Sequence, residues 1–213
     1  MPVEIDTSHG PARAHLHPVD DPLAALVLGH GAGGGVESRD LVAATDAARA
    51  EGVSVALVEQ PYRVAGRRSP APARQLDAAW TAVVERLASG ELEGLPLIVG
   101  GRSLGARVAC RTVEATGPVA VLCLAFPLQP RRRTGTPPPS RVPELDAVTV
   151  PLLVVQGERD PFGMPPEAAH RTVVKVSGDH SLRTDLGAVM TAVQLWIREL
   201  VHERGGIHAR SGG

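Results

Sequence analysis

The chain has 213 residues, a length that fits one domain, and 43% of them are hydrophobic, which is enough for one buried core. Its 22 basic and 23 acidic residues leave a net charge of −1. This balance argues against a nucleic-acid partner, because a phosphate backbone requires a concentrated positive face. Aromatic residues make up only 2% of the chain, so base-stacking platforms for single strands are not expected either.

Short apolar runs alternate with amphipathic runs along the chain. The apolar runs span residues 25–28, 53–58, 96–99, 119–126 and 152–155. Such runs suit strands that are buried on both faces, as in a parallel sheet covered by helices. Apolar residues spaced three and four apart predict helices over 76–87 and 186–200. The alternation predicts an α/β fold in which helices cover both faces of a mostly parallel sheet.

Three further segments complete the expected domain. Residues 3–5 and 12–17 are predicted to form two short strands that add an antiparallel edge to the sheet. Residues 127–146 are rich in proline and arginine and are predicted to form a long loop, which is too short for a cap domain. The tail, residues 205–213, has no periodicity and is predicted to be disordered, so residues 1–204 are expected to form a single domain.

Targeting and redox signals are absent from the sequence. The first 22 residues contain no basic start followed by an apolar run, so no signal peptide is expected. No run approaches the 18 apolar residues of a membrane span. Cys110 and Cys123 lie in apolar stretches and are predicted to be reduced core residues. We expect a cytoplasmic protein without a membrane partner, and the sequence does not predict its oligomeric state.

The pentapeptide Gly101-Arg102-Ser103-Leu104-Gly105 follows an apolar strand and precedes a run that can be helical. In this context G-x-S-x-G is typical of a nucleophile elbow, in which the serine occupies a strained turn between strand and helix. Side chains two residues before or after the serine would collide with that turn. The serine hydroxyl then lies at the carboxyl edge of the sheet, where α/β proteins bind ligands. Ser103 is the candidate nucleophile; the alternative is an ordinary glycine-rich turn.

A serine hydroxyl needs a histidine to accept its proton and an acid to orient that histidine. On this fold the acid and then the histidine follow the serine in the chain. Asp160 and His180 occur in this order, each on a turn just past a predicted strand. Three adjacent strand ends would thus bring Ser103, Asp160 and His180 together. Glu158 is a competing candidate for the acid.

A glycine-rich run after the first parallel strand, His30-Gly31-Ala32-Gly33-Gly34, is the candidate oxyanion loop. Acyl transfer places negative charge on the substrate carbonyl oxygen, which backbone N–H groups must stabilise. Leu104 would supply one N–H group, and either Ala32 or Gly33 would supply the other. We interpret His30 as a residue that holds the loop rather than as a proton shuttle.

Three side chains are candidate substrate contacts: His30, Tyr62 and Arg102. Tyr62 is the only tyrosine of the chain and lies past another strand end. Arg102, together with the cluster at 131–133, would favour an anionic substrate, unless these arginines are solvated loop charges. The lack of a cap predicts a shallow site for short acyl groups. Esters, thioesters and small amides share one oxyanion intermediate, so the sequence does not identify the substrate.

Taken together, these motifs resemble those of the small, uncapped, dienelactone-hydrolase-like members of the α/β-hydrolase superfamily. The matching segments are 30–34, 101–105, Gly157-Glu158-Arg159-Asp160 and Asp179-His180-Ser181. The resemblance implies a serine hydrolase of small acyl esters or thioesters, with Ser103 as nucleophile, His180 as base and Asp160 as acid, and no cofactor. Dienelactone hydrolase itself uses a cysteine, so lactone specificity is not implied. Similar domains in eukaryotic chromatin-complex subunits make a non-catalytic binding protein the alternative.

Two other patterns have weaker support. Residues 29–34 also fit the dinucleotide-binding pattern G-x-G-x-x-G, with Glu59 at the next strand end. In that pattern the helix begins within the glycines, whereas here the helix is expected to begin near Ser38, which can cap it. His15 and His17, with Asp20, resemble part of a metal site. No third ligand stands at a supporting spacing, so no metal is expected.

Overall fold

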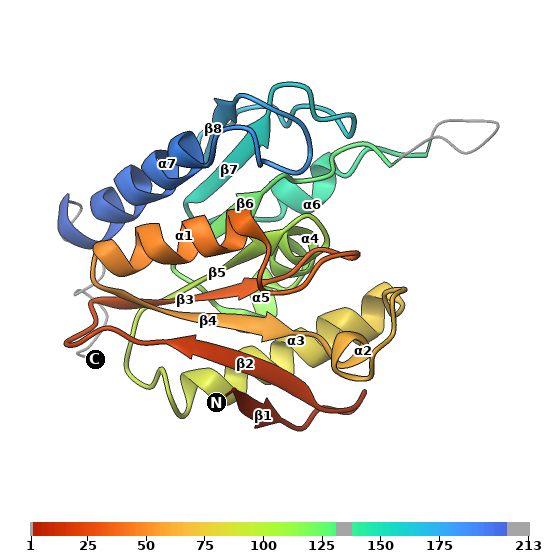
Figure 1. Cartoon of the computed structure of the whole chain (residues 1–213), viewed down its shortest axis with the longest axis vertical. Coiled ribbons are helices and arrows are strands. Elements are labelled where there is room, and N and C mark those ends of the chain that lie inside the picture. Colours follow the sequence, from red (N-terminus) through yellow and green to blue (C-terminus); the bar gives the residue numbers. More distant parts are fainter. Residues whose placement is uncertain (1, 131–137, 204–213) are drawn as a thin grey trace.

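The computed structural model describes residues 2–130 and 138–203 and is built around one sheet (Figure 1). Within these residues eight strands pair in the order β1-β2-β4-β3-β5-β6-β7-β8. The strands are β1 Val3–Ile5, β2 Ala12–His17, β3 Ala24–Gly29, β4 Val53–Glu59, β5 Leu97–Arg102, β6 Ala120–Leu124, β7 Leu152–Gly157 and β8 Arg171–Val176. The strands from β3 to β8 are parallel, and β1 and β2 form the predicted antiparallel edge.

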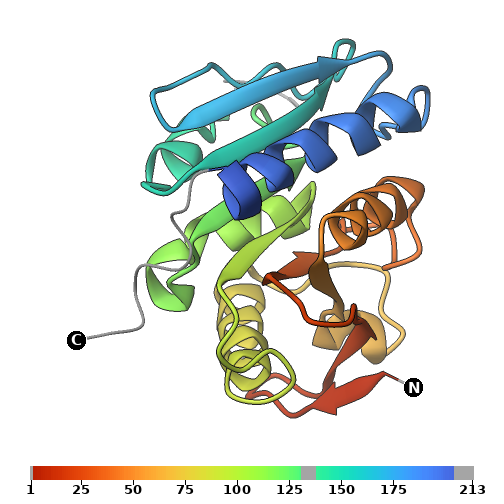
Figure 2. The same ribbon diagram turned by 90° about the vertical axis from the view of Figure 1, so that its left-hand side faces the viewer.

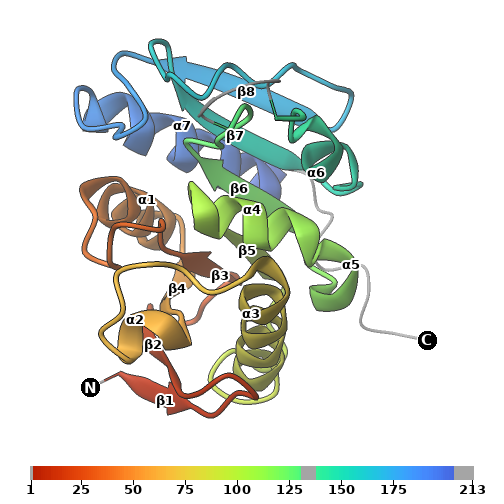
Figure 3. The same ribbon diagram turned by 90° about the vertical axis from the view of Figure 1, so that its right-hand side faces the viewer.

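Helices cover both faces of the sheet, as the alternation of apolar and amphipathic runs predicts. They are α1 Arg39–Ala50, α2 Pro61–Val64, α3 Ala73–Ala88, α4 Leu104–Arg111, α5 Val113–Thr116, α6 Val142–Asp146 and α7 Leu186–Arg198, which continues into a π-helical turn, η1 Glu199–Glu203. Figure 2 shows α1 and α7 on one face, and Figure 3 shows α3 and α4 on the other. None of the helices within residues 2–130 and 138–203 is long and apolar enough to cross a membrane.

Each face of the sheet has its own apolar core. On one side, Trp80 of α3 is fully buried against the central strands. On the other side, Leu41 of α1 and Val193 of α7 pack on the same strands. Burial of each large apolar side chain contributes about 1.5–3 kcal/mol, which makes the sheet a rigid support for the loops at its ends. Cys110 and Cys123 are free and buried in the first core, with their Sγ atoms 3.5 Å apart.

The prediction of an uninterrupted loop over residues 127–146 was wrong at its end, where α6 forms. Pro143 lies in the first turn of this helix, where a missing N–H group leaves no hydrogen bond unmade. Leu145 is fully buried and anchors the helix to the core. The cluster at 131–133 and the tail 205–213 lie outside the described residues. Within the described part, α6 is the only helix between β6 and β7, and its five residues do not make a cap domain.

Candidate active site

Ser103 is the single residue between the last residue of β5 and the first residue of α4. Its backbone has φ 52° and ψ −104°, in the positive-φ region that non-glycine residues rarely adopt. Such a conformation costs on the order of 1–3 kcal/mol. Two hydrogen bonds hold it: the Ser103 N–H donates to the Leu124 carbonyl (2.9 Å), and the Ser103 carbonyl accepts from the Arg107 N–H (3.2 Å). The expected strained turn is therefore present.

The two glycines of the turn are required for a different reason from the predicted one. A Cβ atom on Gly101 would lie 2.5 Å from the carbonyl oxygen of Gly29 in β3 and 2.8 Å from the carbonyl carbon of Gly105. A Cβ atom on Gly105 would lie 2.5 Å from the carbonyl carbon of Gly29. The clash is thus with the neighbouring strand and between the two glycines, because the turn packs directly on β3.

We expect Gly105→Ala to lower the free energy of unfolding by about 3 kcal/mol, because the added methyl group cannot be accommodated without moving β3 or α4. Urea denaturation followed by circular dichroism measures this change. Gly35→Ala is the matched control, since nothing lies within 4 Å of a Cβ atom at that position; we expect it to remain within about 0.5 kcal/mol of wild type. Equal stabilities of the two variants would contradict the close packing of the turn on β3.

The side chains of Ser103, His180 and Asp160 form a continuous hydrogen-bonded chain. The Ser103 Oγ atom lies 2.9 Å from His180 Nε2, and His180 Nδ1 lies 2.8 Å from Asp160 Oδ2. The Asp160 side chain is 1% exposed and that of His180 is 19% exposed, so the carboxylate is shielded from solvent and the imidazole is partly open to it. The Phe162 ring packs on the imidazole, with the ring centroids 4.5 Å apart.

The strand ends that carry these residues are not all adjacent, contrary to the prediction. Ser103 follows β5, whereas Asp160 and His180 follow β7 and β8, and β6 lies between β5 and β7. Leu124, the last residue of β6, pairs with Val155, and β7 continues beyond that level. The loops after β7 and β8 therefore carry their side chains back across the end of β6 to reach Ser103.

The Asp160 carboxylate is held by donors that the sequence reasoning missed. Gln156 Nε2, at the end of β7, donates to Asp160 Oδ2 (2.8 Å), and the Phe162 N–H donates to Oδ1 (2.8 Å). The same Gln156 amide lies within hydrogen-bonding distance of two backbone carbonyls, so it is fixed in place. Gln156 is a polar residue in an otherwise apolar strand, and this pattern was the signal in the sequence that could have identified it. Glu158, the competing acid, is exposed.

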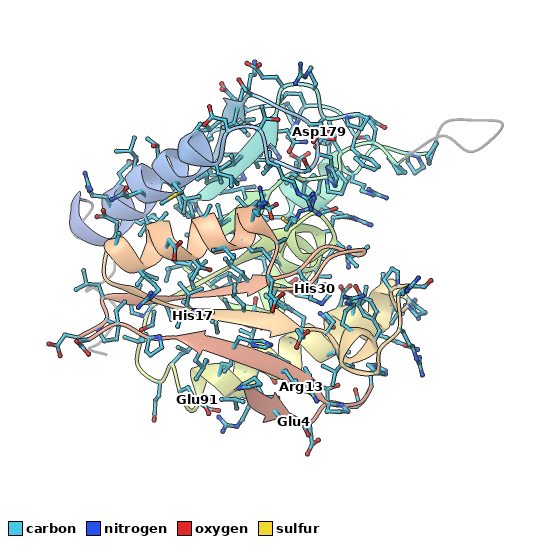
Figure 4. All side chains as sticks on the ribbon, viewed as in Figure 1. Glu4, Arg13, His17, His30, Glu91 and Asp179 are labelled. Carbon is cyan, nitrogen blue, oxygen red and sulfur yellow. The ribbon has the colours of Figure 1, made fainter. Side chains whose placement is uncertain are left out.

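The residue before His180 makes a separate, local arrangement. The Asp179 carboxylate accepts hydrogen bonds from the Ser181 N–H (2.9 Å) and the Ser181 hydroxyl (2.6 Å). These bonds lower the pKa of Asp179, which is exposed on the loop after β8 (Figure 4). Its carboxylate therefore braces the turn that carries His180.

The Arg102 guanidinium links three segments around the site. Its Nε atom forms an ion pair with Asp40 of α1 (2.7 Å), and its Nη2 atom donates to the backbone carbonyl of His180 (3.1 Å). The Asp40 side chain is 1% exposed. Arg102 thus connects the serine turn, the first turn of α1 and the loop of the histidine. Its charge is paired within the protein.

His30 and Tyr62 both brace the glycine-rich loop after β3. His30 is buried at the end of that strand (Figure 4), where its Nδ1–H donates to the Gly31 carbonyl (2.8 Å) and its Nε2 accepts from the Gln60 N–H (3.2 Å). Burial lowers the pKa of His30, which favours the neutral ring that this pattern requires. The Tyr62 hydroxyl donates to the Ala32 carbonyl (3.2 Å), and burial raises its pKa to about 12.

The backbone N–H groups predicted for the oxyanion hole lie on neighbouring segments. Gly29, the last residue of β3, pairs with Gly101 of β5, so the loop after β3 begins beside the serine turn. Leu104 is the first residue of α4, where N–H groups have no partner within the helix. In the described part of the chain, the N–H groups of Ala32 and Gly33 donate to no backbone carbonyl.

A small polar pocket of about 180 Å³ lies next to this loop. Its lining residues are Gly33, Gly34, Ser38, Asp40, Arg102, Ser181 and Arg183. Of these, Arg102 directly precedes Ser103, and Ser181 directly follows His180. The pocket therefore borders the segments that carry Ser103 and His180.

The geometry disfavours the two alternative patterns in the sequence. The first helix after the glycines begins at Arg39, beyond Gly35, so its N-terminus does not lie within the glycine run. Ser38 occupies the N-cap position but makes no capping hydrogen bond with its side chain; instead, Asp40 Oδ1 accepts the N–H of Leu41 (3.0 Å). Glu59 is paired with His15 (2.9 Å), which accounts for both residues without a ribose or a metal.

The sheet order, the strained serine turn and the Ser–His–Asp chain together define an α/β-hydrolase fold. The chain belongs to this family: the family model described as the alpha/beta hydrolase domain matches residues 22–200. A search of functionally curated proteins found no match to the sequence.

Solved structures share the fold at low sequence identity. A serine hydrolase without a lid from Xanthomonas campestris superposes with a TM-score of 0.74, at 19% identity over 95% of each chain. Est1E from Butyrivibrio proteoclasticus, bound to ferulic acid, has a TM-score of 0.74 at 18% identity, over 92% of this chain and 98% of its own. Dienelactone hydrolase from Anabaena variabilis has a TM-score of 0.73 at 14% identity, over 95% and 96%. The resemblance to uncapped, dienelactone-hydrolase-like proteins is confirmed at the level of the fold.

Proposed function

We propose that the protein is a serine hydrolase that cleaves small acyl esters or thioesters through an acyl-enzyme at Ser103. The observation that carries this proposal is the hydrogen-bonded chain from Ser103 Oγ to His180 and on to the buried carboxylate of Asp160. Family membership adds support, since one of the similar structures is described as a serine hydrolase without a lid.

In the first half of the reaction, Ser103 Oγ attacks the carbonyl carbon of the substrate while His180 Nε2 accepts the hydroxyl proton. The imidazolium that forms is stabilised by the Asp160 carboxylate, which accepts the Nδ1–H hydrogen bond. Collapse of the tetrahedral intermediate breaks the bond to the alcohol or thiol. His180 gives its proton to that leaving group, which departs and leaves the acyl group on Ser103.

In the second half, water replaces the leaving group. His180 Nε2 accepts a proton from the water as its oxygen attacks the acyl carbon. The second tetrahedral intermediate collapses, the bond to Ser103 Oγ breaks, and the proton returns from His180 to the serine. The products are a carboxylic acid and the free enzyme, so no cofactor is consumed in the cycle.

The negative charge of both intermediates requires hydrogen-bond donors that are in place before the reaction. We assign one donor to the Leu104 N–H, which directly follows the nucleophile at the start of α4. The second donor comes from the loop after β3, at Ala32 or Gly33. Loss of one such donor typically costs about 3 kcal/mol of transition-state stabilisation.

The expected substrates are small because the described residues include no cap domain between β6 and β7. Within the described residues, only α6, a helix of five residues, separates β6 from β7. The adjoining pocket has a volume of about 180 Å³ and a largely polar lining. A short acyl group therefore fits better than a long acyl chain, which needs a deep apolar pocket.

Covalent labelling of Ser103 tests this function. Wild-type protein treated with a fluorophosphonate probe at neutral pH is expected to gain the mass of one probe less HF, because the activated hydroxyl attacks phosphorus, loses its proton and displaces fluoride. Intact-mass spectrometry measures the adduct. Ser103→Ala is expected to gain nothing. Ser89→Ala, which removes an exposed hydroxyl at the end of α3, serves as the matched control and should label like wild type.

The outcome separates the hydrolase from the binding protein that shares its fold. A single adduct that depends on Ser103, followed by turnover of short-chain p-nitrophenyl esters, supports the enzyme. Folded wild-type protein that gains no adduct would overturn the proposal and favour a non-catalytic binding role. An adduct that persists in Ser103→Ala would show that another residue reacts.

A further inference from the structure

Tyr62 lies on the side of the glycine-rich loop opposite the nucleophile. The sheet order places β3 between β4 and β5. The loop follows β3, Tyr62 belongs to α2 directly after β4, and Ser103 follows β5. The hydroxyl of Tyr62 therefore reaches the Ala32 carbonyl from the β4 side, at 3.2 Å.

This contact determines the direction of an N–H group. The Ala32 carbonyl and the Gly33 N–H belong to the same peptide unit, which is planar and trans, so they point in opposite directions. A donor that holds the carbonyl toward β4 directs the N–H toward β5. Ser103 lies at the end of β5, where the charge of the tetrahedral intermediate would develop.

The loop needs such a brace because its own sequence does not restrain it. No heavy atom lies within 4 Å of a Cβ atom built on Gly33, Gly34 or Gly35, so these glycines are not held by packing. Glycine also permits more backbone conformations than any other residue. Tyr62, in contrast, is 4% exposed and packs in the core, with its ring 5.7 Å from that of His30. The buried Tyr62 side chain is therefore the rigid partner that orients the flexible glycine-rich loop.

We propose that Tyr62 is a positioning residue of the oxyanion hole: its hydroxyl holds the Ala32 carbonyl and so aims the Gly33 N–H at the oxyanion formed on Ser103. This inference rests on the proposed hydrolase function. It also assigns the second oxyanion donor to Gly33 rather than to Ala32, and it gives Tyr62 a role other than contact with the substrate.

Tyr62→Phe tests the inference, because it removes the hydroxyl and keeps the buried ring. We expect kcat on a short-chain ester to fall by about tenfold, less than the roughly 10²–10³ for complete loss of a donor, since the N–H remains but is not aimed. KM is expected to stay unchanged, because the ground-state carbonyl makes little use of the hole. Steady-state kinetics measures both constants.

A matched pair of substrates distinguishes positioning from general damage. In a thionoester, sulfur replaces the carbonyl oxygen, and this thiocarbonyl sulfur accepts hydrogen bonds poorly. Hydrolysis of a thionoester therefore gains less from the oxyanion hole than hydrolysis of the corresponding ester. Tyr62→Phe should therefore reduce the preference for ester over thionoester by about the factor lost in kcat. Placing 4-aminophenylalanine at position 62 restores a donor and should restore most of the rate. Thermal unfolding verifies that each variant is folded.

Each result has one meaning. Wild-type protein that gains no fluorophosphonate adduct and hydrolyses neither substrate would refute the proposed function and, with it, the role of Tyr62. An active wild type with an equally active, equally selective Tyr62→Phe variant would overturn the inference. An equal loss of rate on ester and thionoester would also overturn it, since a structural defect affects both substrates alike.

Discussion

Ser103→Ala is expected to lower kcat for a short-chain p-nitrophenyl ester by about four to six orders of magnitude. The alanine variant has no nucleophile, and the residual rate comes from water that attacks a bound and polarised substrate. His180→Ala should cost a similar factor, because His180 Nε2 is the base that lies 2.9 Å from the Ser103 hydroxyl. Since the two residues act as one unit, the double variant should be no slower than either single variant.

The fall in kcat of Ser103→Ala and of His180→Ala must be distinguished from a failure of these variants to fold. His180→Ala leaves the Asp160 carboxylate with hydrogen bonds from Gln156 and Phe162, so the buried charge keeps its partners. We therefore expect circular dichroism spectra like that of wild type, and Ser89→Ala should retain the full rate. A folded Ser103→Ala protein that turns over at the wild-type rate would show that hydrolysis does not pass through this serine.

Asp160→Asn is expected to lower kcat by about 10³–10⁴, less than either loss above. The reason lies in the donors around the carboxylate. Gln156 Nε2 faces Oδ2, together with the imidazole, and the Phe162 N–H faces Oδ1. An asparagine amide must place its NH₂ group against one of these donors, whichever way it turns. If the NH₂ group faces His180, the imidazole takes the tautomer in which Nε2 carries the proton and cannot accept another.

Glu158→Gln provides the matched control for this substitution. Glu158 lies two residues before Asp160 on the same loop and is exposed, so its neutral variant should keep the wild-type rate. Steady-state kinetics on the same ester compares the two variants directly. If Glu158→Gln lost activity while Asp160→Asn kept it, Glu158 would be the acid that orients the histidine.

The sequence by itself was sufficient to predict the sheet, most of its strands and the catalytic candidates. Strands buried on both faces need continuous apolar runs, and a helix packed on a sheet needs apolar residues three and four apart, so both leave local patterns. The serine turn is also local, because Gly101 and Gly105 flank Ser103 within five residues. The short helices α2 and α6 were missed, since four or five residues contain too few turns to show a period.

Only the tertiary structure decided how these elements act on one another. The close contact of Gly101 and Gly105 with Gly29 depends on the strand order β3-β5, which no local pattern encodes. The same holds for the position of β6 between β5 and β7.

Which partners the site residues contact was likewise decided by the tertiary structure, although Gln156 stands out in the sequence as a polar residue in an apolar strand. Gln156 on Asp160, Asp40 on Arg102 and Tyr62 on the Ala32 carbonyl are hydrogen bonds or ion pairs between side chains and groups that the fold brings together. Residue type and spacing indicate which groups can react. Their orientation depends on these contacts, because a polar side chain takes its direction from whichever partner the packing places beside it.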